Sequence, residues 1–422
     1  MARHASVHVW LPGRADPVAA GDFAWDSPKG PGRFQYAATY LDRRDALALD
    51  PIHLSLGSRS LDTARQTGVF GVFRDSGPDS WGETQIKRKL GRADLDPFDR
   101  LVLGSSNGAG CLVLGDIDPS RSEAIWTPED LHRAYDSWIT QQPPEQPQPM
   151  EEFISAVAPA TSQGGAKPKL ELVAEQRMWM LKFPAQGDPD DLAGIEAAAL
   201  SLARACGIET PEHRTVQIGA GTPKSGLMIE RFDRRRVDGG FARHAYASAY
   251  TVMDLDTGSE GPERRSYLNF AHEALRWCAS GTDRRHGDAQ RREIWRRIVF
   301  NALVNNNDDH PRNHALIKDG PLWRLSPIFD VVPVGQHQAQ RVLSMAFRRE
   351  REFANVASRE NLLACSRLYG WRQQEAEQEL QRMALIVNHD WEAMMLRHGT
   401  TRRSIGQRAS AFGLAMEIAA AA

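Results

Sequence analysis

The sequence has few cysteines and no long apolar run, and these absences exclude several classes of protein. Its four cysteines are widely spaced and include no CxxC pair, which argues against a disulfide framework or a zinc site and predicts buried, reduced thiols. No window reaches the length of a membrane-spanning helix. The first residues alternate apolar and polar side chains, unlike the apolar core of a signal peptide. We therefore expect a cytoplasmic protein that makes no membrane contact.

The sequence also lacks a large excess of charge of one sign, since 52 Lys and Arg residues nearly balance 54 Asp and Glu residues. A net charge of −2 argues against a strong field for nucleic acid or membranes over the whole chain. With 41% hydrophobic and 25% charged residues, the composition is that of a globular protein. A length of 422 residues exceeds what one typical core supports, and we expect two or three domains.

The most informative stretch is the polar run at residues 305–313, which is followed downstream by Phe329-Asp330. Phosphoryl transfer needs a carboxylate that accepts the proton of the attacking hydroxyl, and it needs an amide and a second carboxylate that hold Mg²⁺ ions. Protein kinases place the catalytic Asp and a metal-binding Asn at the separation found here, with a second metal-binding Asp further along the chain. This spacing predicts Asp308 as the catalytic base and Asn313 and Asp330 as metal ligands.

Two alternatives stay open for this stretch. Asp, Asn, His and Pro are also the ordinary residues of a polar turn, so the run alone could be a plain loop. Its flanks favour the catalytic interpretation, because an amphipathic helix over residues 290–303 precedes it and a hairpin over residues 315–325 follows it. Only the spacing to the later Asn selects Asp308 over its neighbour. A rival enzyme would be a metal-dependent hydrolase with Asp308, Asp309 and His310 as ligands.

A glycine-rich stretch at residues 162–169 precedes an apolar strand and is a candidate phosphate-binding loop. Paired glycines allow backbone amides to approach phosphate oxygens, and lysines add positive charge. The stretch is neither a Walker A loop nor a GxGxxG fingerprint, so a hairpin without a ligand is the alternative. The predicted cofactor contacts in this stretch are Gly164, Gly165, Ala166, Lys167 and Lys169.

Lys182 lies in an apolar strand predicted at residues 178–183, where a buried cation needs an anionic partner. A phosphate could be that partner, and so could Glu196, which lies near the start of the next predicted helix. A lysine that reaches the surface is the alternative. We assign Lys182 to both the catalytic and the cofactor-binding set.

A second apolar strand is predicted around residues 227–230, and charged residues follow it directly. In a kinase such a strand leads into the hinge, whose backbone donor and acceptor pair with adenine. Glu230, Arg231 and Phe232 are therefore predicted to contact the cofactor, and His310 of the polar run is assigned to the same set. Each signal is weak alone, and their order along the chain carries the interpretation.

The first part of the chain shows a different pattern. Short apolar runs predict strands at residues 6–11, 34–36 and 52–56, which Gly and Pro clusters separate. A helix predicted over residues 128–139 leads into a tract rich in Pro and Gln at residues 141–149. The prolines of this tract lack amide donors, so we expect an exposed linker and a domain boundary there.

Taken together, the chain resembles the HipA family of serine/threonine kinases, the toxins of HipBA-type toxin–antitoxin systems. The segments that carry the resemblance run nearly from end to end, and those of the hinge and the catalytic loop are the most specific. They are residues 9–13, 78–82, 164–169, 181–184, 230–234, 308–313 and 329–330. The chain departs from the family at residues 243–247, where the usual acidic residues after the histidine are missing.

The resemblance implies an α+β, two-lobed protein-kinase-like fold. It implies a small β-rich N-terminal subdomain at residues 1–140 and a Pro/Gln-rich linker at residues 141–152. The nucleotide-binding part would follow at residues 153–235, and an all-helical C-terminal lobe with the catalytic loop at residues 236–422.

The resemblance also implies ATP and Mg²⁺ as cofactors and growth arrest through phosphorylation of serine or threonine on a cellular protein, such as an aminoacyl-tRNA synthetase. It implies a small helix-turn-helix antitoxin, similar to HipB, through which the pair binds operator DNA. Ser162 holds the place of a serine that some members autophosphorylate. An alternative outside enzymology is a catalytically weak co-repressor that binds DNA with its antitoxin.

Overall fold

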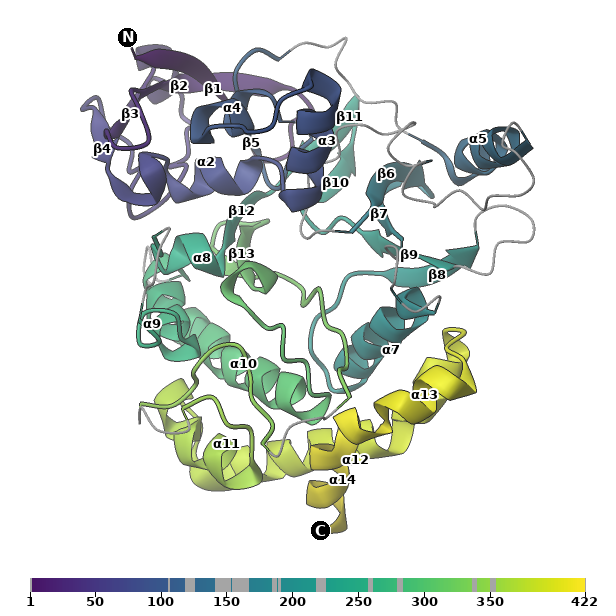
Figure 1. Ribbon diagram of the computed structural model, residues 1–422. Helices are drawn as coiled ribbons and strands as arrows, with labels where there is room; N and C mark the ends of the chain where they lie inside the picture. The colour runs from purple at the N-terminus through teal and green to yellow at the C-terminus, as the bar shows by residue number, and fades with distance from the viewer. Residues whose placement is uncertain are drawn as a thin grey trace.

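The computed structural model describes residues 2–104, 107–117, 126–140, 153, 167–183, 188, 191–217, 225–256, 261–278, 284–335, 340–349 and 354–421. It combines β-sheets with helices, as the predicted α+β class requires. Figure 1 shows the strand-rich N-terminal part above a helical C-terminal part, with a small sheet beside them. Among the described residues, no helix is both long and apolar enough to cross a membrane. All four cysteines are buried and free, as predicted.

A five-stranded antiparallel sheet in the order β4-β3-β2-β1-β5 forms the N-terminal subdomain. Its strands are β1 (Arg3–Trp10), β2 (Pro17–Trp25), β3 (Gly32–Tyr36), β4 (Leu61–Thr63) and β5 (Leu112–Leu114). Alternate side chains of β1, among them Val7 and Val9, are buried, because successive residues of a strand point to opposite faces. The strands predicted at residues 6–11 and 34–36 are confirmed.

The strand predicted at residues 52–56 is wrong, because this segment forms a turn with a single bridge between Asp50 and Leu54. The Asp50 carboxylate accepts hydrogen bonds from the backbone amides of Ile52 and His53, at 2.7 and 3.0 Å. An aspartate that bonds the amides just after it stabilises a turn rather than an extended strand. The alternation of apolar and polar residues at 52–56 was therefore not a strand signal.

Short helices cover this sheet. They are α1 (Ala38–Leu41), the 3-10 turn η1 (Arg65–Thr67), α2 (Gly71–Ser76), α3 (Ser80–Leu90) and α4 (Pro97–Val102). Phe70 and Phe73 of the α2 region pack edge to face against Phe23 of β2, with ring centroids 6.3 and 5.4 Å away. Aromatic pairs of this geometry stabilise a core beyond the apolar area that they bury.

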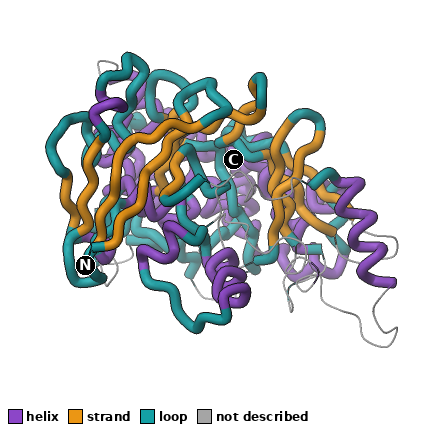
Figure 2. The backbone as a smooth tube through the Cα atoms, turned by 90° about the horizontal axis from the view of Figure 1, so that it is seen from above, coloured by secondary structure: helices purple, strands orange, loops and turns teal. Residues whose placement is uncertain are grey.

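A second, four-stranded sheet forms the predicted nucleotide-binding part, and its strand order is β6-β7-β9-β8. Its elements are β6 (Lys169–Ala174), β7 (Arg177–Lys182), α7 (Leu192–Ala205), β8 (His213–Gln217) and β9 (Ser225–Glu230). Seen from above, this sheet and the N-terminal sheet are separate groups of strands (Figure 2). The predicted strands and helix of this region are thereby confirmed.

Helix α5 (Pro128–Thr140), which lies in the range predicted for the N-terminal subdomain, packs on this second sheet. Leu131 and Tyr135 of α5 join a hydrophobic cluster with Leu170 and Leu172 of β6. Trp126, just before the helix, forms a bridge with Leu172. The same cluster includes Trp81 of α3, so α5 packs where the second sheet meets the N-terminal subdomain. The linker predicted at residues 141–152 lies outside the described residues.

The C-terminal lobe is helical, as predicted, and it also carries a small three-stranded sheet. Its helices are α8 (Ala249–Val252), α9 (Tyr267–Cys278), α10 (Arg284–Leu303), α11 (Arg359–Cys365), α12 (Gln373–Arg397), α13 (Arg402–Arg408) and α14 (Gly413–Ala420), with 3-10 turns η3 (Pro311–Asn313), η4 (Ser366–Tyr369) and η5 (Ala409–Phe412). The sheet contains β12 (Ala245–Ser248), β13 (Ala315–Lys318) and β14 (Arg324–Leu325), and a separate hairpin joins β10 (Arg234–Val237) to β11 (Gly240–Arg243). The β13–β14 pair is the hairpin predicted after the polar run.

Asp79 links the N-terminal subdomain to the second sheet. Its Oδ1 atom accepts a hydrogen bond from the amide of Gly82 at 2.7 Å and so caps α3. Its Oδ2 atom forms an ion pair with Nζ of Lys169, whose side chain is only 1% exposed. Burial lowers the pKa of Lys169, and the Asp79 carboxylate opposes that shift. The two parts of the chain are thus joined by a buried charge pair.

We predict that Asp79→Asn lowers the free energy of unfolding by about 3–5 kcal/mol, because it removes the carboxylate that contacts the buried Lys169 ammonium. The variant keeps a residue that caps helices well, so the loss reports the ion pair rather than the cap. The matched control is Asp96→Asn: Asp96 caps α4 and pairs with Arg3, but both side chains are more than a third exposed. An exposed pair of that kind contributes about 1 kcal/mol or less. Equal losses in urea unfolding of the two variants would contradict the prediction.

Candidate active site

The polar run follows α10, and its asparagines fix the course of the loop. Asn305 adopts a left-handed backbone conformation with a φ of 48°, which ends the helix and which Asn tolerates better than most residues. Its Nδ2 atom donates to the carbonyl of Val334 at 2.6 Å. Nδ2 of Asn306 donates to Oδ1 of Asn301 at 3.1 Å. These bonds tie the loop to the end of α10 and to the segment that follows Asp330.

The two adjacent aspartates of the loop point to different surroundings. The side chain of Asp308 is 77% exposed, and its backbone carbonyl accepts a hydrogen bond from Nδ2 of Asn313 at 2.7 Å. Asp309 is 0% exposed and accepts hydrogen bonds from the amide of Ser344 at 2.6 Å and from the Tyr267 hydroxyl. Burial raises the pKa of Asp309 to about 6. Asp309 therefore anchors the loop, while the carboxylate of Asp308 is available to a ligand.

Lys182 of β7 lies between two carboxylates. Its Nζ atom is 2.9 Å from Oε1 of Glu196 in α7, and it also contacts Oδ1 of Asp330. The predicted pairing of Lys182 with Glu196 is confirmed. Burial acts to lower the pKa of Lys182, but the charges of Asp330 and Glu196 outweigh it and raise that pKa. The lysine is thus a buried, paired cation.

Asp330 adopts a left-handed backbone conformation, with a φ of 54°. Such a conformation is costly for a residue other than glycine and clusters at functional sites. Burial acts to raise the pKa of Asp330, but the neighbouring charge of Lys182 outweighs it, and the pKa is lowered. Asp330 is therefore held as a carboxylate in a conformation that the surrounding structure imposes.

The predicted phosphate-binding residues divide into two groups. Lys169 lies directly across from Lys182 in the β6–β7 pair, so two lysines face the same region. Nζ of Lys167 lies 3.5 Å from Oδ2 of Asp188. The other residues of this prediction lie outside the described residues: Ser162, Gly164, Gly165 and Ala166.

The predicted hinge residues line a small, mostly apolar cavity of about 90 Å³. The Phe232 ring packs against Phe329, with centroids 5.8 Å apart. The Glu230 carboxylate accepts a bond from Arg177 at 2.8 Å, and the buried guanidinium of Arg231 donates to carboxylates of Glu171 and Asp233. Of the three predicted side chains, that of Phe232 is the one suited to contact a purine, because the other two are engaged in ion pairs.

A second cavity, of about 450 Å³, adjoins the first and is polar. The predicted base and both predicted metal ligands line it, and His310 does so as well. The two cavities share Ala109, Tyr246 and Asp330 as lining residues. An apolar pocket beside a polar cleft that contains oxygen ligands fits a purine nucleotide whose phosphates carry Mg²⁺. Ala109 and Tyr246 are not predictable as site residues from the sequence, because neither lies in a motif with a chemical signal.

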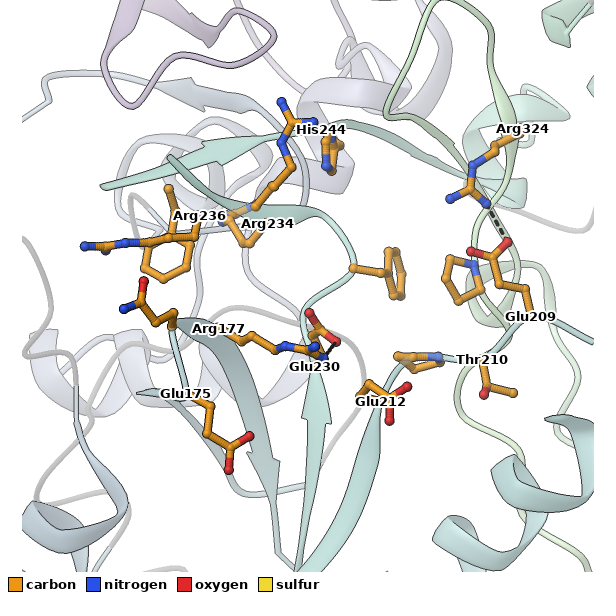
Figure 3. A pocket seen from close by; sticks show the side chains of 16 residues that line it. Glu175, Arg177, Glu209, Thr210, Glu212, Glu230, Arg234, Arg236, His244 and Arg324 are labelled. Carbon is orange, nitrogen blue, oxygen red and sulfur yellow. Dashed lines mark hydrogen bonds and ion pairs between the residues drawn. The ribbon is translucent and has the colours of Figure 1, made fainter. Parts of the chain in front are cut away.

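A third cavity, of about 610 Å³, lies on the other side of the hinge and is lined by many charged side chains (Figure 3). Two ion pairs lie within this lining, Arg177 with Glu230 at 2.8 Å and Arg324 with Glu209 at 2.7 Å. The predicted base and metal ligands do not line it. We therefore place the candidate active site in the first two cavities.

Hydrolase chemistry has less support than phosphoryl transfer. Within the described parts of the chain, no three His, Cys, Asp or Glu side chains come together as a metal site. The carboxylate of Asp309, which the hydrolase would use as a ligand, is bonded to Ser344 and Tyr267 instead. A kinase site needs fewer protein ligands, because the nucleotide phosphates supply others.

We predict a pH signature for the buried carboxylate of Asp309. Its folded-state pKa of about 6 lies above the ordinary value of 3.8, so the unfolded chain loses this proton first as the pH rises. The wild-type protein should therefore lose up to about 3 kcal/mol of stability relative to Asp309→Asn between pH 4 and 6, and no more above that range. Urea unfolding at several pH values measures this difference. Asp308→Asn is the control for an exposed carboxylate in the same loop, and a pH-independent difference for Asp309→Asn would refute the prediction.

Comparison with known proteins agrees with the geometry. Two family models match the chain: a HipA N-terminal domain at residues 7–115 and a HipA-like C-terminal domain at residues 161–391. A protein of Haemophilus influenzae named "Putative kinase" is 29% identical over 210 residues, which is 46% of this chain and 60% of the relative. "Putative kinase Y4dM" of Sinorhizobium fredii is 26% identical over 196 residues, which is 43% of this chain and 44% of the relative. The chain thus spans about half the length of these relatives.

The solved structure of a Shewanella oneidensis HipA, in a complex of HipA, HipB and operator DNA, has the same fold. The match has a TM-score of 0.69 and 17% sequence identity, and it covers 99% of this chain and 96% of the other. The C-terminal family model alone covers more than half of the 422 residues. On this evidence, the chain belongs to the HipA family.

Proposed function

We propose that this chain is an ATP- and Mg²⁺-dependent serine/threonine protein kinase. The observation that carries the proposal is that Asp308, Asn313 and Asp330 line one cleft, beside an apolar cavity that Lys182 also lines. Membership in the HipA family and the names of the two relatives support the same activity. In this proposal the chain is the toxin of a type II toxin–antitoxin system, and it arrests growth by phosphorylating a cellular protein, such as an aminoacyl-tRNA synthetase.

In the proposed reaction, Asp308 would accept the proton of the substrate hydroxyl as its oxygen bonds to the γ-phosphorus of ATP. The bond from that phosphorus to the bridging oxygen of the β-phosphate would break, and ADP would leave. Asn313 and Asp330 would hold Mg²⁺, which neutralises charge on the phosphates. Lys182 would bind phosphate oxygens while Glu196 keeps it in place. Asp330 and Lys182 contact each other through Oδ1 of Asp330 in this structure, and the second carboxylate oxygen of Asp330 would serve the metal. Glu196 can remain paired with Lys182 when nucleotide and metal bind.

The proposed partners follow from the family and from the complex of the Shewanella protein with HipB and operator DNA. We propose a helix-turn-helix antitoxin for this chain, and DNA binding through that antitoxin. A catalytically weak co-repressor would use the same partners without phosphoryl transfer. The acidic and amide groups that face the cleft favour the kinase, since a co-repressor has no need of them.

Autophosphorylation at Ser162 stays a proposal from the resemblance alone. A phosphate there would add roughly −1.5 to −2 charges beside the triphosphate that the glycine-rich loop is expected to hold. Repulsion would then weaken nucleotide binding and switch the kinase off. Mapping of phosphosites after incubation of the wild-type protein with ATP and Mg²⁺ tests this regulation.

We predict that Asp308→Ala lowers the rate of phosphate transfer about 10²–10⁴-fold, because it removes the general base. ATP affinity should stay close to that of the wild type, since the base acts on the transfer step. Transfer from labelled ATP to a lysate of the host cell, or to the chain itself, measures the rate, and calorimetry measures the affinity. Near-normal transfer by Asp308→Ala would show that the base is wrongly assigned. Metal-dependent hydrolysis without phosphate transfer by the wild type would favour the hydrolase.

A second prediction separates the metal ligand from the base. Asp330→Asn should weaken Mg²⁺-dependent nucleotide binding more than Asp308→Ala does, because Mg²⁺ prefers charged oxygen ligands. It also removes the anion that contacts Lys182, so the comparison is made with and without Mg²⁺. A difference that appears only with Mg²⁺ supports the metal role. Equal nucleotide affinities of the two variants in calorimetry with Mg²⁺ would contradict this division of roles.

A further inference from the structure

The polar cleft has a second wall, which the N-terminal subdomain provides. Besides the candidate catalytic residues, the cleft is lined by side chains of η1, α2, α3 and α4. Its volume of about 450 Å³ falls in the range of ligand sites in proteins. A general base must lie within hydrogen-bond reach of the hydroxyl that it deprotonates. Because Asp308 lines this cleft, the acceptor of the phosphate has to enter it and meet the N-terminal subdomain.

The N-terminal wall is fastened to the catalytic lobe close to the catalytic loop. The Asp75 carboxylate accepts bonds from the amide and the hydroxyl of Ser248, at 2.7 and 2.8 Å. Gly71 lies so close to Thr251 that an added Cβ would sit 2.6 Å from its methyl group. In Figure 1, α2 faces β12 and α8. The wall therefore keeps a defined position relative to Asp308.

Gln66 and Thr67 form the rim of this wall, and their backbone is strained. Gln66 and Thr67 both have a positive φ, of 49° and 61°, and both line the cleft. The amide of Gln66 donates to Asp256 at 2.7 Å, and Arg65 donates to the carbonyl of Asp254 at 2.6 Å. Two successive left-handed residues other than glycine persist only where their surroundings hold them, and such strain clusters at functional sites. The rim is thus held in place beside the cleft at a cost in backbone energy.

The charges in the cleft are unevenly matched. The carboxylates on its N-terminal side have nearby partners: Asp79 contacts Lys169, and Glu83 lies 2.8 Å from Nζ of Lys87. Arg74 of α2, in contrast, donates to the neutral amide of Gln66 at 3.1 Å. Arg100 of the same wall lies 3.2 Å from Glu83, so Arg74 differs from it in donating to a neutral group.

Arg74 shares an aromatic ring with a second cation. Its guanidinium lies 4.9 Å from the ring of Tyr250, and that of Arg312, in the catalytic loop, lies 4.4 Å from the same ring. Two cations on one ring repel each other, and both line the cleft. An anion between them would relieve this repulsion.

We propose that Arg74 and Arg312 bind an acidic side chain of the protein substrate, next to the serine or threonine that is phosphorylated. This proposal rests on the proposed kinase activity and adds a determinant of substrate choice. Arg74 belongs to the N-terminal subdomain and Arg312 to the catalytic loop, so selection of the substrate requires both parts of the chain. A guanidinium suits this task because its fixed array of donors matches a carboxylate.

The test uses the full-length protein and a library of Ser/Thr peptides in which one flanking position at a time is fixed. We expect the wild type to favour an acidic over a basic residue at one flanking position by about tenfold in kcat/KM, as one charge-assisted contact allows. Arg74→Glu should reverse this preference, and Arg74→Gln, which keeps a polar side chain of similar reach, should abolish it. Arg33→Glu, on the exposed side of β3 in the same subdomain, is the matched control and should keep the preference.

The outcomes separate this proposal from the kinase activity itself. If the wild type transfers phosphate neither to itself nor to any peptide, the kinase activity fails and the substrate proposal fails with it. If the wild type is active but shows no acidic preference, or phosphorylates only itself, the substrate proposal alone is overturned. A rise in KM for ATP in Arg74→Gln with an unchanged peptide preference would assign Arg74 to the nucleotide and also overturn it.

Discussion

A buried cation is stable only beside an anion. This constraint determines how the N-terminal subdomain, the second sheet and the catalytic lobe contact one another. Lys169 and Lys182 lie side by side on β6 and β7, inside the protein. The anion for Lys169 comes from the N-terminal subdomain, as Asp79, and one anion for Lys182 comes from the catalytic lobe, as Asp330. Removal of one partner from such a pair costs far more than loss of an exposed pair. The two lysines therefore hold the N-terminal subdomain and the catalytic lobe against the same sheet.

A difference in burial explains how two adjacent aspartates can have different tasks. Asp309 is buried, and its bonds to Ser344 and Tyr267 hold the loop at the price of a raised pKa. Because the loop is anchored there, Asp308 needs no structural bond through its own carboxylate and can face the cleft. In a loop with only one aspartate, the same carboxylate could not both anchor the backbone and serve as an available base. Two adjacent aspartates allow each carboxylate to have one of these tasks.

The sequence alone could predict local elements and the order of the chemical groups. The apolar strand around Lys182 and the helix around Glu196 were recognisable, and so was their pairing, because each signal depends on nearby residues. The failed strand at residues 52–56 shows the limit: two backbone amides bonded to Asp50 outweigh an alternating pattern. Long-range pairs such as Asp79 with Lys169 were not predictable, since no local pattern links residues so far apart in the chain. The contribution of Arg74 to the cleft was missed for the same reason.

The N-terminal subdomain is thus part of the candidate site rather than an appendage to it. Arg231, directly after β9, donates to the backbone carbonyls of Asn107 and Gly108, and Arg234 donates to that of Gly110 at 2.9 Å. Without residues 107–110, these two buried guanidinium groups would lose carbonyl acceptors and keep only their carboxylate partners. Without Asp79, which also belongs to the N-terminal subdomain, Lys169 would lose the carboxylate that it contacts. Loss of a hydrogen-bond acceptor or of an ion-pair partner is destabilising for a buried cation. The kinase-like part therefore depends on the N-terminal subdomain for its own stability, and a cleft closed on one side by that subdomain follows from the same contacts.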